Sequence, residues 1–477
     1  MKTIKRILSV LLALLTIFSI VSVNMSYAAE KYGWNIEDGE FYYPVFNEKD
    51  MKLSGDFYYT VDEDGTAIIQ KVVDKSYAGK TLVIPAKIDG HKVKGMYVEE
   101  YLNDPFSKLK KSGNIDTITS VKVEEGIKQL LLLGVFNYPE SSPYFDEYAP
   151  KAIKGIFSEM KNLVKVSLPS TLRAVDPGMF SYCSSLKSIT IPDNVEFIDE
   201  SAFLGCSSLK SVKLSRKLKR IYLQAFRDCV SLESVDITKN VETIEGGAFR
   251  NCKSLKSVKL PQSLAFIGGG AFKNCKKLKK ITLPSGLVSI GSGAFWGCDS
   301  LEGKMKLPKK LKEVGDGAFA FCYGLTGFRI ADGNKYFSQK GGVLFNKKKT
   351  KIYCYLSGKE TKEYKIPSTV KSVSRYAFAG TKHLNKLTFS DKITKIPEDT
   401  FYESKVKHIV FSKSVKEIKD DSLSHNKSLR SLTVKNKKCK MPGHWDYKGK
   451  KITVYGYKNS TAQTFAKKAK LKFVKLK

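Results

Sequence analysis

The chain has 477 residues and a formal net charge of +35, from 82 Lys plus Arg against 47 Asp plus Glu. The charge is uneven, because residues 30–150 hold 14 lysines, no arginine and 21 acidic residues, whereas 151–477 carry a net charge of +39. A basic surface of this size attracts polyanions, and the export signal described below excludes nucleic acid as the expected partner. What remains are anionic cell-wall polymers, membrane phospholipids and acidic glycans, or a lysine surface that is merely solvated.

The first residues have the pattern of a secretory signal peptide. Three basic residues precede an uncharged, mostly apolar run over 7–23, and small residues follow at Ser26 and Ala28. This pattern predicts a signal peptide over 1–28, whose cleavage leaves no transmembrane segment, followed by an N-terminal extension over 29–54. The competing interpretation is an uncleaved anchor, since the run is near the lower limit for spanning a bilayer. We therefore expect a secreted protein, or one held non-covalently at the cell surface.

A phenylalanine recurs every 23 residues through the middle of the chain. The series runs through Phe157, Phe180, Phe203, Phe226, Phe249, Phe272 and Phe295, and Phe319 follows one residue late. Within one period, Ile189 and Ile191 alternate with polar residues as in a short strand, and Pro192 ends it. The later spacing Ala-Phe-x-x-Cys-x-x-Leu is that of a helical turn. The period predicts an α/β solenoid of coils of about 23 residues, each a short parallel strand plus a short helical return.

Departures from this period divide the chain into segments. We expect an N-terminal cap and degenerate repeats with aromatic inserts over 55–156, regular repeats over 157–330, and further repeats over 365–440. An inserted β-hairpin over 331–364 interrupts the repeats, and a C-terminal cap covers 441–477. Glycines that precede the repeat phenylalanines, as at Gly246 and Gly268, are expected to permit tight corners.

Seven of the nine cysteines keep the same period. Each follows a repeat phenylalanine by three residues: Cys183, Cys206, Cys229, Cys252, Cys275, Cys298 and Cys322. Met160 fills the same position after Phe157, which favours a column of buried, reduced thiols. Disulfides between neighbouring coils are the alternative. A metal site is less favoured, because no two cysteines have a CxxC spacing.

The repeat consensus resembles the BspA-like, treponemal class of bacterial leucine-rich repeats. The resemblance rests on Leu-x-x-Ile-x-Leu-Pro-x-x-Leu-x-x-Ile-Gly-x-x-Ala-Phe-x-x-Cys and extends from about Gly55 to the C-terminus. Residues 55–67 resemble that family's opening hairpin, and 454–473 resemble its closing cap. The resemblance implies a secreted or surface-displayed binding protein, in some members an adhesin, and implies no catalytic residue.

Two surfaces are candidate binding sites. The aromatic candidates lie in the segments that break the period, namely Tyr97, Tyr101, Tyr138, Tyr144, Phe145 and Tyr148 in the N-terminal inserts and Tyr353 and Tyr355 in the hairpin. Inserted loops often carry recognition, with tyrosine as an anchor. The alternative for the inserts is that these rings cover the open end of the core.

The second candidate surface is the exposed face of the repeat strands. Its basic side chains are Lys165, Lys213, Lys259, Lys280, Lys306 and Arg329. They could form an extended site for an acidic protein or glycan, or an ordinary solvated strand face. The face has no aromatic anchor, so we expect weak or multivalent binding.

The sequence therefore predicts an extracellular protein that binds an unidentified protein or glycan. Adhesion to host or other cells is a role consistent with this prediction. We expect no enzyme activity, catalytic residue, metal or cofactor. One alternative is a wall-associated structural protein retained by ionic contacts with anionic polymers, since 401–477 carry a net charge of +16. Another is an enzyme within residues 30–150.

Overall fold

The computed structural model describes residues 36–37, 40–41, 51–62, 64–98, 106–127, 129–132, 155–443, 445 and 451–477. The chain divides into two compact units, Met1–Met51 and Lys52–Lys477. In the first unit, β1 (Ile36–Glu37) pairs antiparallel with β2 (Glu40–Phe41). The predicted signal peptide lies outside the described residues. Within the described ranges, no helix has the length and apolar character needed to cross a membrane.

The second unit begins with an antiparallel hairpin at the place where the opening hairpin is expected. Its first sheet contains β3 (Lys52–Ser54), β4 (Phe57–Val61), β5 (Ala67–Val72), β7 (Lys87–Ile88), β8 (His91–Val98) and β10 (Gln129–Leu132). A parallel sheet follows, with β6 (Thr81–Ile84), β9 (Ser120–Val123) and β11 (Lys165–Ser167). Helix α2 (Ser107–Ser112) and the 3-10 turn η2 (Asn114–Thr117) come between β8 and β9. Phe106, next to α2, is fully buried and lies 6.0 Å from the ring of Phe157, so it covers the first ring of the repeat column.

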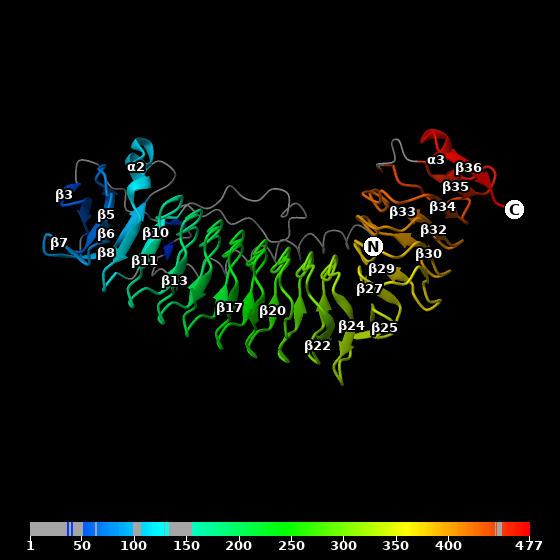
Figure 1. Cartoon of the computed structure of the whole chain (residues 1–477), viewed down its shortest axis with the longest axis horizontal. Helices are drawn as coiled ribbons and strands as arrows, with labels where there is room; N and C mark the ends of the chain where they lie inside the picture. The colour runs from blue at the N-terminus through cyan, green and yellow to red at the C-terminus, as the bar shows by residue number, and fades with distance from the viewer. Residues whose placement is uncertain are drawn as a thin grey trace. The chain divides into compact units, whose positions relative to one another are not determined.

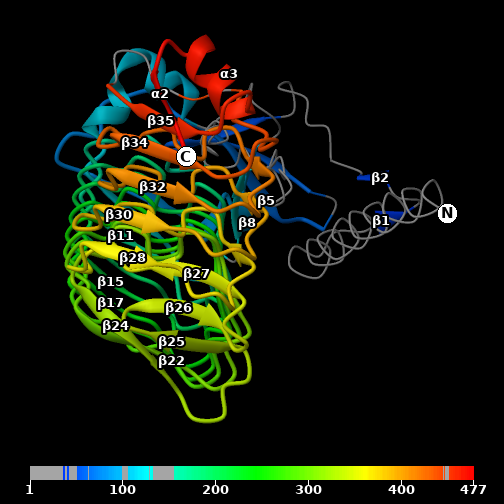
Figure 2. The same ribbon diagram turned by 90° about the vertical axis from the view of Figure 1, so that its right-hand side faces the viewer.

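The regular coils carry two columns of short parallel strands (Figure 1). The first column is β13 (Ser188–Thr190), β15 (Ser211–Lys213), β17 (Ser234–Asp236), β19 (Ser257–Lys259), β22 (Gly303–Leu307) and β24 (Leu325–Ile330). The second is β12 (Ala174–Val175), β14 (Phe197–Ile198), β16 (Arg220–Ile221), β18 (Thr243–Ile244), β20 (Phe266–Ile267), β21 (Ser289–Ile290) and β23 (Glu313–Val314). In Figure 2, β11, β15, β17 and β24 lie on one flank of the coils. The sequence predicted the first column and missed the second.

The predicted helical return is not confirmed, since the described coils between 155 and 443 contain turns at that place. The coils from Phe180 to Phe319 each have left-handed residues two before and two after the phenylalanine. Around Phe249 these are Gly247 (φ 62°) and Asn251 (φ 61°), and an α-helix cannot pass through such residues. The Phe249 amide instead donates to the Ala271 carbonyl of the next coil at 2.7 Å, and the Cys252 amide donates to the Phe249 carbonyl at 3.2 Å. The apolar spacing is helical, but the first of these bonds joins neighbouring coils and the second closes a single turn within one coil.

The core is a stack of equivalent side chains. The repeat rings from Phe157 to Phe319 are fully buried and lie 5.1–5.6 Å apart from coil to coil, nearly parallel in the later coils. All nine cysteines are free and buried, as favoured from the sequence. Each repeat thiol donates to the phenylalanine carbonyl of the preceding coil, for example Cys206 Sγ to Phe180 O at 3.1 Å. Burial raises the pKa of the Cys183 thiol to about 12, so the column stays protonated.

The segment between the regular and the later coils forms an antiparallel sheet of three strands. It consists of β25 (Phe337–Lys340), β26 (Val343–Asn346) and β27 (Lys351–Tyr355). Alternate residues of β26 contact different cores, because Leu344 belongs to the core before it and Val343 and Phe345 to the core after it. Both faces of this inserted sheet are therefore buried against neighbouring coils.

The later coils repeat the two columns less regularly. The first column continues as β28 (Glu363–Lys365), β30 (Lys386–Thr388), β32 (His408–Phe411), β34 (Ser431–Val434), β35 (Thr453–Gly456) and β36 (Lys472–Lys475). The second continues as β29 (Ser372–Val373), β31 (Lys395–Ile396) and β33 (Glu417–Ile418). Helix α3 (Thr461–Lys468) packs Ala462 and Ala466 at the end of the core. Its N-terminal amides are capped by Ser460, whose hydroxyl accepts from the Gln463 amide.

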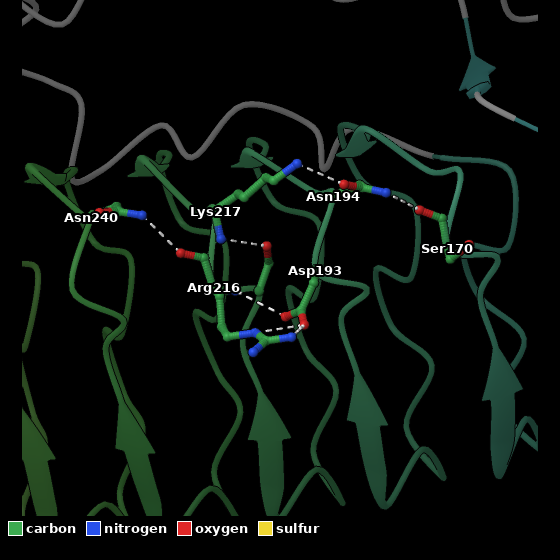
Figure 3. Close-up of polar contacts among 7 residues, drawn as sticks. Ser170, Asp193, Asn194, Arg216, Lys217 and Asn240 are labelled. Atoms are coloured by element: carbon green, nitrogen blue, oxygen red, sulfur yellow. Dashed lines mark hydrogen bonds and ion pairs between the residues drawn. The ribbon is translucent and has the colours of Figure 1, made fainter.

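Polar side chains brace neighbouring coils at the corner that follows the first column. Asn194 Nδ2 donates to the Ser170 carbonyl at 2.8 Å, and Asn240 Nδ2 donates to the Arg216 carbonyl at 2.9 Å (Figure 3). Arg216 Nε also donates to Asp193 Oδ2 at 2.7 Å. These bonds satisfy carbonyls that face solvent at the turns, and they fix the register of one coil on the next.

Candidate functional site

The aromatic candidates of the N-terminal inserts remain predictions. Tyr101, Tyr138, Tyr144, Phe145 and Tyr148 lie outside the described residues, and Tyr97 belongs to β8. The covering role weighed as their alternative is filled in the structure by Phe106, a neighbour of these candidates in the sequence.

The two tyrosines of the inserted strands have different environments. Tyr353 is half-buried, with its ring 5.4 Å from that of Phe337 and Lys351 Nζ 4.6 Å from its centre. Tyr355 is only 1% exposed and lies 5.5 Å from the ring of Phe378. Its amide donates to the Ala377 carbonyl, the bond that a repeat phenylalanine makes. Tyr355 therefore occupies the phenylalanine position of an irregular coil, and this burial corrects its assignment as a surface anchor.

The six predicted basic side chains of the first column are all exposed and form one surface, which we call the lysine face. It comprises Lys165, Lys213, Lys259, Lys280, Lys306 and Arg329. Lys306 and Arg329 are direct partners across β22 and β24, and Lys259 lies opposite Asp236. Within the described residues none of the six forms an ion pair. Like charges placed opposite each other destabilise a sheet, so this face favours a bound anion.

A second surface, which the sequence did not indicate, lies over the second strand column. It is a cavity of about 530 Å³ that crosses four successive coils. Its floor consists of glycines, namely Gly246, Gly247, Gly268, Gly269, Gly270 and Gly291. On the strand side it is lined by Arg220, Thr243, Phe266 and Ser289, and on the turn side by Gln224, Arg227 and Arg250. We call this surface the glycine groove.

The floor is free of side chains for two different reasons. A Cβ on Gly268 would lie 2.5 Å from the Glu245 carbonyl carbon, and one on Gly291 would lie 2.4 Å from the Gly269 amide nitrogen. These glycines are required because the backbones of adjacent coils touch there. Gly269 differs, since its nearest neighbour would be the Ser292 oxygen at 3.3 Å and its φ is not left-handed. A side chain at Gly269 would therefore meet a milder steric conflict than one at Gly268 or Gly291, and its absence keeps the groove open.

The turn-side wall is a ladder of residues that directly follow the repeat phenylalanines. A Cβ on Gly247 would lie 3.8 Å from Arg250 Cβ, and one on Gly270 would lie 3.7 Å from Lys273 Cβ. The ladder runs through Arg227, Arg250, Lys273 and Trp296, one residue per coil. Lys273 Nζ lies 5.4 Å from the centre of the Trp296 ring, so the last basic residue of the ladder contacts an aromatic ring.

The aromatic end is a separate, partly exposed cluster. Trp296 lies 4.8 Å from Phe321, 4.9 Å from Tyr376 and 5.7 Å from Tyr402, measured between ring centres. Phe321 is 8% exposed, and the other three rings are half-buried. Burial raises the pKa of Tyr402, which keeps its hydroxyl protonated as a donor.

The groove is net cationic although two of its arginines have acidic neighbours. Arg220 Nε lies 3.3 Å from Glu245 Oε1, and Arg227 Nε lies 3.3 Å from Asp228 Oδ2. Arg227 Nη1 also donates to Gln224 Oε1 at 3.0 Å, which holds its guanidinium in place. Three arginines and one carboxylate line the cavity itself.

One signal in the sequence could have revealed the groove. A basic residue follows the phenylalanine in three successive periods, and glycines precede the phenylalanine in the second and third of them. The glycine pattern predicts corners, and the breaks in the period predict the binding segments. Left-handed φ angles support the corner interpretation only at Gly247, Gly270, Gly293 and Gly317.

Comparisons with known proteins agree with the repeat geometry. The BspA type Leucine rich repeat region matches in six copies over residues 149–246, 219–341 and 348–469, more than half of the chain. No curated protein matches.

Three solved structures illustrate the similarity. A leucine-rich cell surface protein of Faecalibacterium prausnitzii is 20% identical, with 83% of this chain and 94% of that chain covered and a TM-score of 0.47. A leucine-rich repeat protein of Bacteroides ovatus is 20% identical, with 89% and 100% covered and a TM-score of 0.49. The pneumococcal vaccine antigen PcpA is 20% identical, with 90% and 98% covered and a TM-score of 0.43.

The family assignment rests on the repeat match, and the fold described above explains it. The positions that recur in the repeat pattern of this chain are the stacked phenylalanines, the thiol column and the inward residues of the strands. This chain belongs to the BspA-type leucine-rich repeat family.

Proposed function

We propose that this chain is a secreted or surface-displayed recognition protein, without catalytic activity, whose lysine face binds an acidic protein or glycan. The observation that carries the proposal is the column of exposed cations that form no ion pair within the described residues. Lys306 and Arg329 are adjacent at strand spacing, about 4.8 Å, and the other cations recur along the same face, where Asp236 lies opposite Lys259. The excess of positive charge gives the face a net positive potential that steers an acidic ligand to it. Adhesion to host or other cells is the biological role that fits such a surface.

The test compares two variants with the same change in charge. The first replaces Lys213, Lys259 and Lys306 by Gln on the lysine face. The control replaces Lys217, Lys239 and Lys309 by Gln, which are exposed at corners of the regular coils.

We expect the mature protein to bind immobilised sulfated glycan and acidic matrix protein in a saturable, salt-sensitive manner. The lysine-face variant should lose most of this binding, and the corner variant should keep it. Equal losses in the two variants would show that only the total charge matters, which would overturn the proposal.

A second candidate function is retention at the producing cell by ionic contacts with anionic wall polymers. The observation in its favour is the density of exposed lysines near the C-terminal end, including Lys435, Lys437, Lys438, Lys467 and Lys468. A wash with concentrated salt should release the protein from cells if these contacts hold it. Retention that is insensitive to salt would exclude this function.

A further inference from the structure

We propose that the glycine groove is a binding site for an extended, carboxylate-bearing polysaccharide, which lies along the stack of coils toward the aromatic cluster at Trp296. The site is separate from the lysine face, because the groove lies over the second strand column and the lysine face lies on the first. The inference shares with the proposed function only the premise that this chain is a binding scaffold, so either can fail alone.

The charge of the groove selects an anion. Three arginines line the cavity against the single carboxylate of Glu245, and Lys273 continues the ladder beyond it. Arginine offers parallel N–H donors that match the two oxygens of a carboxylate, a geometry that lysine cannot reproduce. Because Gln224 and Asp228 contact the Arg227 guanidinium, this arginine is held in place before a ligand arrives.

The spacing of the ladder selects a polymer of sugars over a peptide. Equivalent residues of adjacent coils follow the rise of the stack, which the ring separations measure as 5.1–5.6 Å. One hexopyranose unit advances an extended glycan by about this distance. In a two-fold chain the carboxylates on one side recur at every second unit, so they would stay in register with every second coil of the ladder. An extended peptide places side chains on one side ~6.7 Å apart and would lose register after a few residues.

The shape of the groove agrees with this ligand. The glycine floor can accept flat rings over three of the four coils, and Phe266, 48% exposed, adds an apolar edge on the strand side. At the far end, the half-buried Trp296 is fixed by its contact with Tyr376. An aromatic face of this kind packs on the C–H face of a sugar, while the tyrosine hydroxyls can bond its hydroxyls.

The probe is an oligogalacturonate of defined length, titrated into the full mature chain by calorimetry. Its methyl ester, which lacks the charge, and poly-L-glutamate, which has the charge on a peptide, serve as comparison ligands. Two variants address the groove. Arg250→Gln removes one guanidinium. Gly269→Leu fills the floor with a side chain that the repeat already accepts, since Leu223 occupies the equivalent position two coils earlier.

We expect saturable binding of oligogalacturonate that weakens about tenfold or more in each groove variant. Lys259→Gln on the lysine face and Lys239→Gln at a corner should leave it nearly unchanged. Thermal unfolding of every variant identifies a loss that follows from misfolding, and Arg250→Gln provides the decisive result if Gly269→Leu is unstable.

Several outcomes would overturn the inference. Equal affinity for poly-L-glutamate or for the methyl ester would exclude selection of a carboxylated glycan. Absence of binding, or binding that neither groove variant weakens, would exclude the groove as the site. Loss of binding in the Lys259→Gln variant alone would assign the ligand to the lysine face, which would support the proposed function and refute the groove.

Discussion

The regular coils before the inserted strands and the later coils after them use the same position for different chemistry. Three residues after the phenylalanine, the regular coils carry a cysteine whose thiol donates to a carbonyl of the preceding coil. The later coils carry Thr381, Ser404 and Asn426, all at most 1% exposed. Thr381 Oγ1 donates to the Phe378 carbonyl at 3.2 Å, and Asn426 Nδ2 donates to the Val406 carbonyl at 3.0 Å. In these coils the position carries a buried polar or thiol side chain, whereas Met160 fills it in the first coil without a donor, so a hydrogen bond is common there but not required.

The surface differs between the same two regions. Before the phenylalanine, the regular coils have the glycines that form the groove floor. The later coils have an ion pair there, in which Arg375 donates to Asp399 Oδ2 through Nε at 2.9 Å and Nη2 at 2.6 Å. One backbone path therefore supports an open cationic groove in one region and a filled, neutralised surface in the other. The core alone does not determine where a coil can bind.

The largest expected effect concerns the ring column. Phe249 lies between parallel rings at 5.3 and 5.4 Å, whereas Phe401 has one parallel neighbour, at 5.9 Å, and is followed by Leu423. Phe249→Ala should lower the free energy of unfolding by about 3–5 kcal/mol, measured by urea unfolding. Phe249→Leu should cost more than Phe401→Leu, because the later column already accepts leucine. Equal costs would show that the two cores pack alike.

The second effect concerns the groove floor. Gly268→Ala should destabilise the protein by about 1–3 kcal/mol, because its Cβ would overlap the backbone of the preceding coil. Gly269→Ala should cost less, about 1 kcal/mol, because its Cβ would lie 3.3 Å from the Ser292 oxygen, a tight contact that a small shift relieves. Thermal unfolding of the pair checks this difference. If both substitutions are tolerated, close approach of the coils does not explain the glycine at 268.

A smaller effect is expected when one core position is converted to the chemistry of the other region. Cys252→Ser should cost about 1 kcal/mol, since the hydroxyl is less apolar but finds the Phe226 carbonyl that the thiol contacts at 3.1 Å. Cys252→Val removes the donor and serves as the comparison. A larger loss for Ser than for Val would indicate that the position selects apolar character and that its hydrogen bond is unimportant.

The thiol column also predicts a gradual loss of stability in alkali. Burial raises the pKa of the Cys183 thiol to about 12 and that of Cys354 likewise to about 12, whereas an unfolded thiol titrates near 8.5. The folded state therefore binds these protons more tightly, and its advantage is complete below about pH 8.5 and is lost as the pH rises toward 12. The melting temperature should fall between pH 8 and 10, and less so when column cysteines are replaced by serine. A constant melting temperature over this range would contradict buried, protonated thiols.

Much of the fold could be predicted from the sequence, because the repeat is set by local rules that recur at fixed offsets. The strand before Pro192, the stacked phenylalanines and the free thiols all follow from side-chain alternation and from the need to bury equivalent residues together. The prediction of a helical return was wrong because apolar spacing does not determine the backbone φ angles, and Asn251 adopts the left-handed conformation that ends a helix. The prediction that Tyr355 is a surface anchor was wrong because the break in the period hid its repeat position, whereas its backbone hydrogen bond places it in the phenylalanine column.

The sequence by itself determined the family, the period and the chemistry of the core, since each coil repeats the same short-range pattern. Only the tertiary structure decided which side chains from different coils meet. The glycine groove exists because residues 23 positions apart stack at 5.1–5.6 Å, so that Arg227 and Arg250 become neighbours across a floor of backbone. Stacking converts a period along the chain into a surface perpendicular to it, and binding depends on that surface.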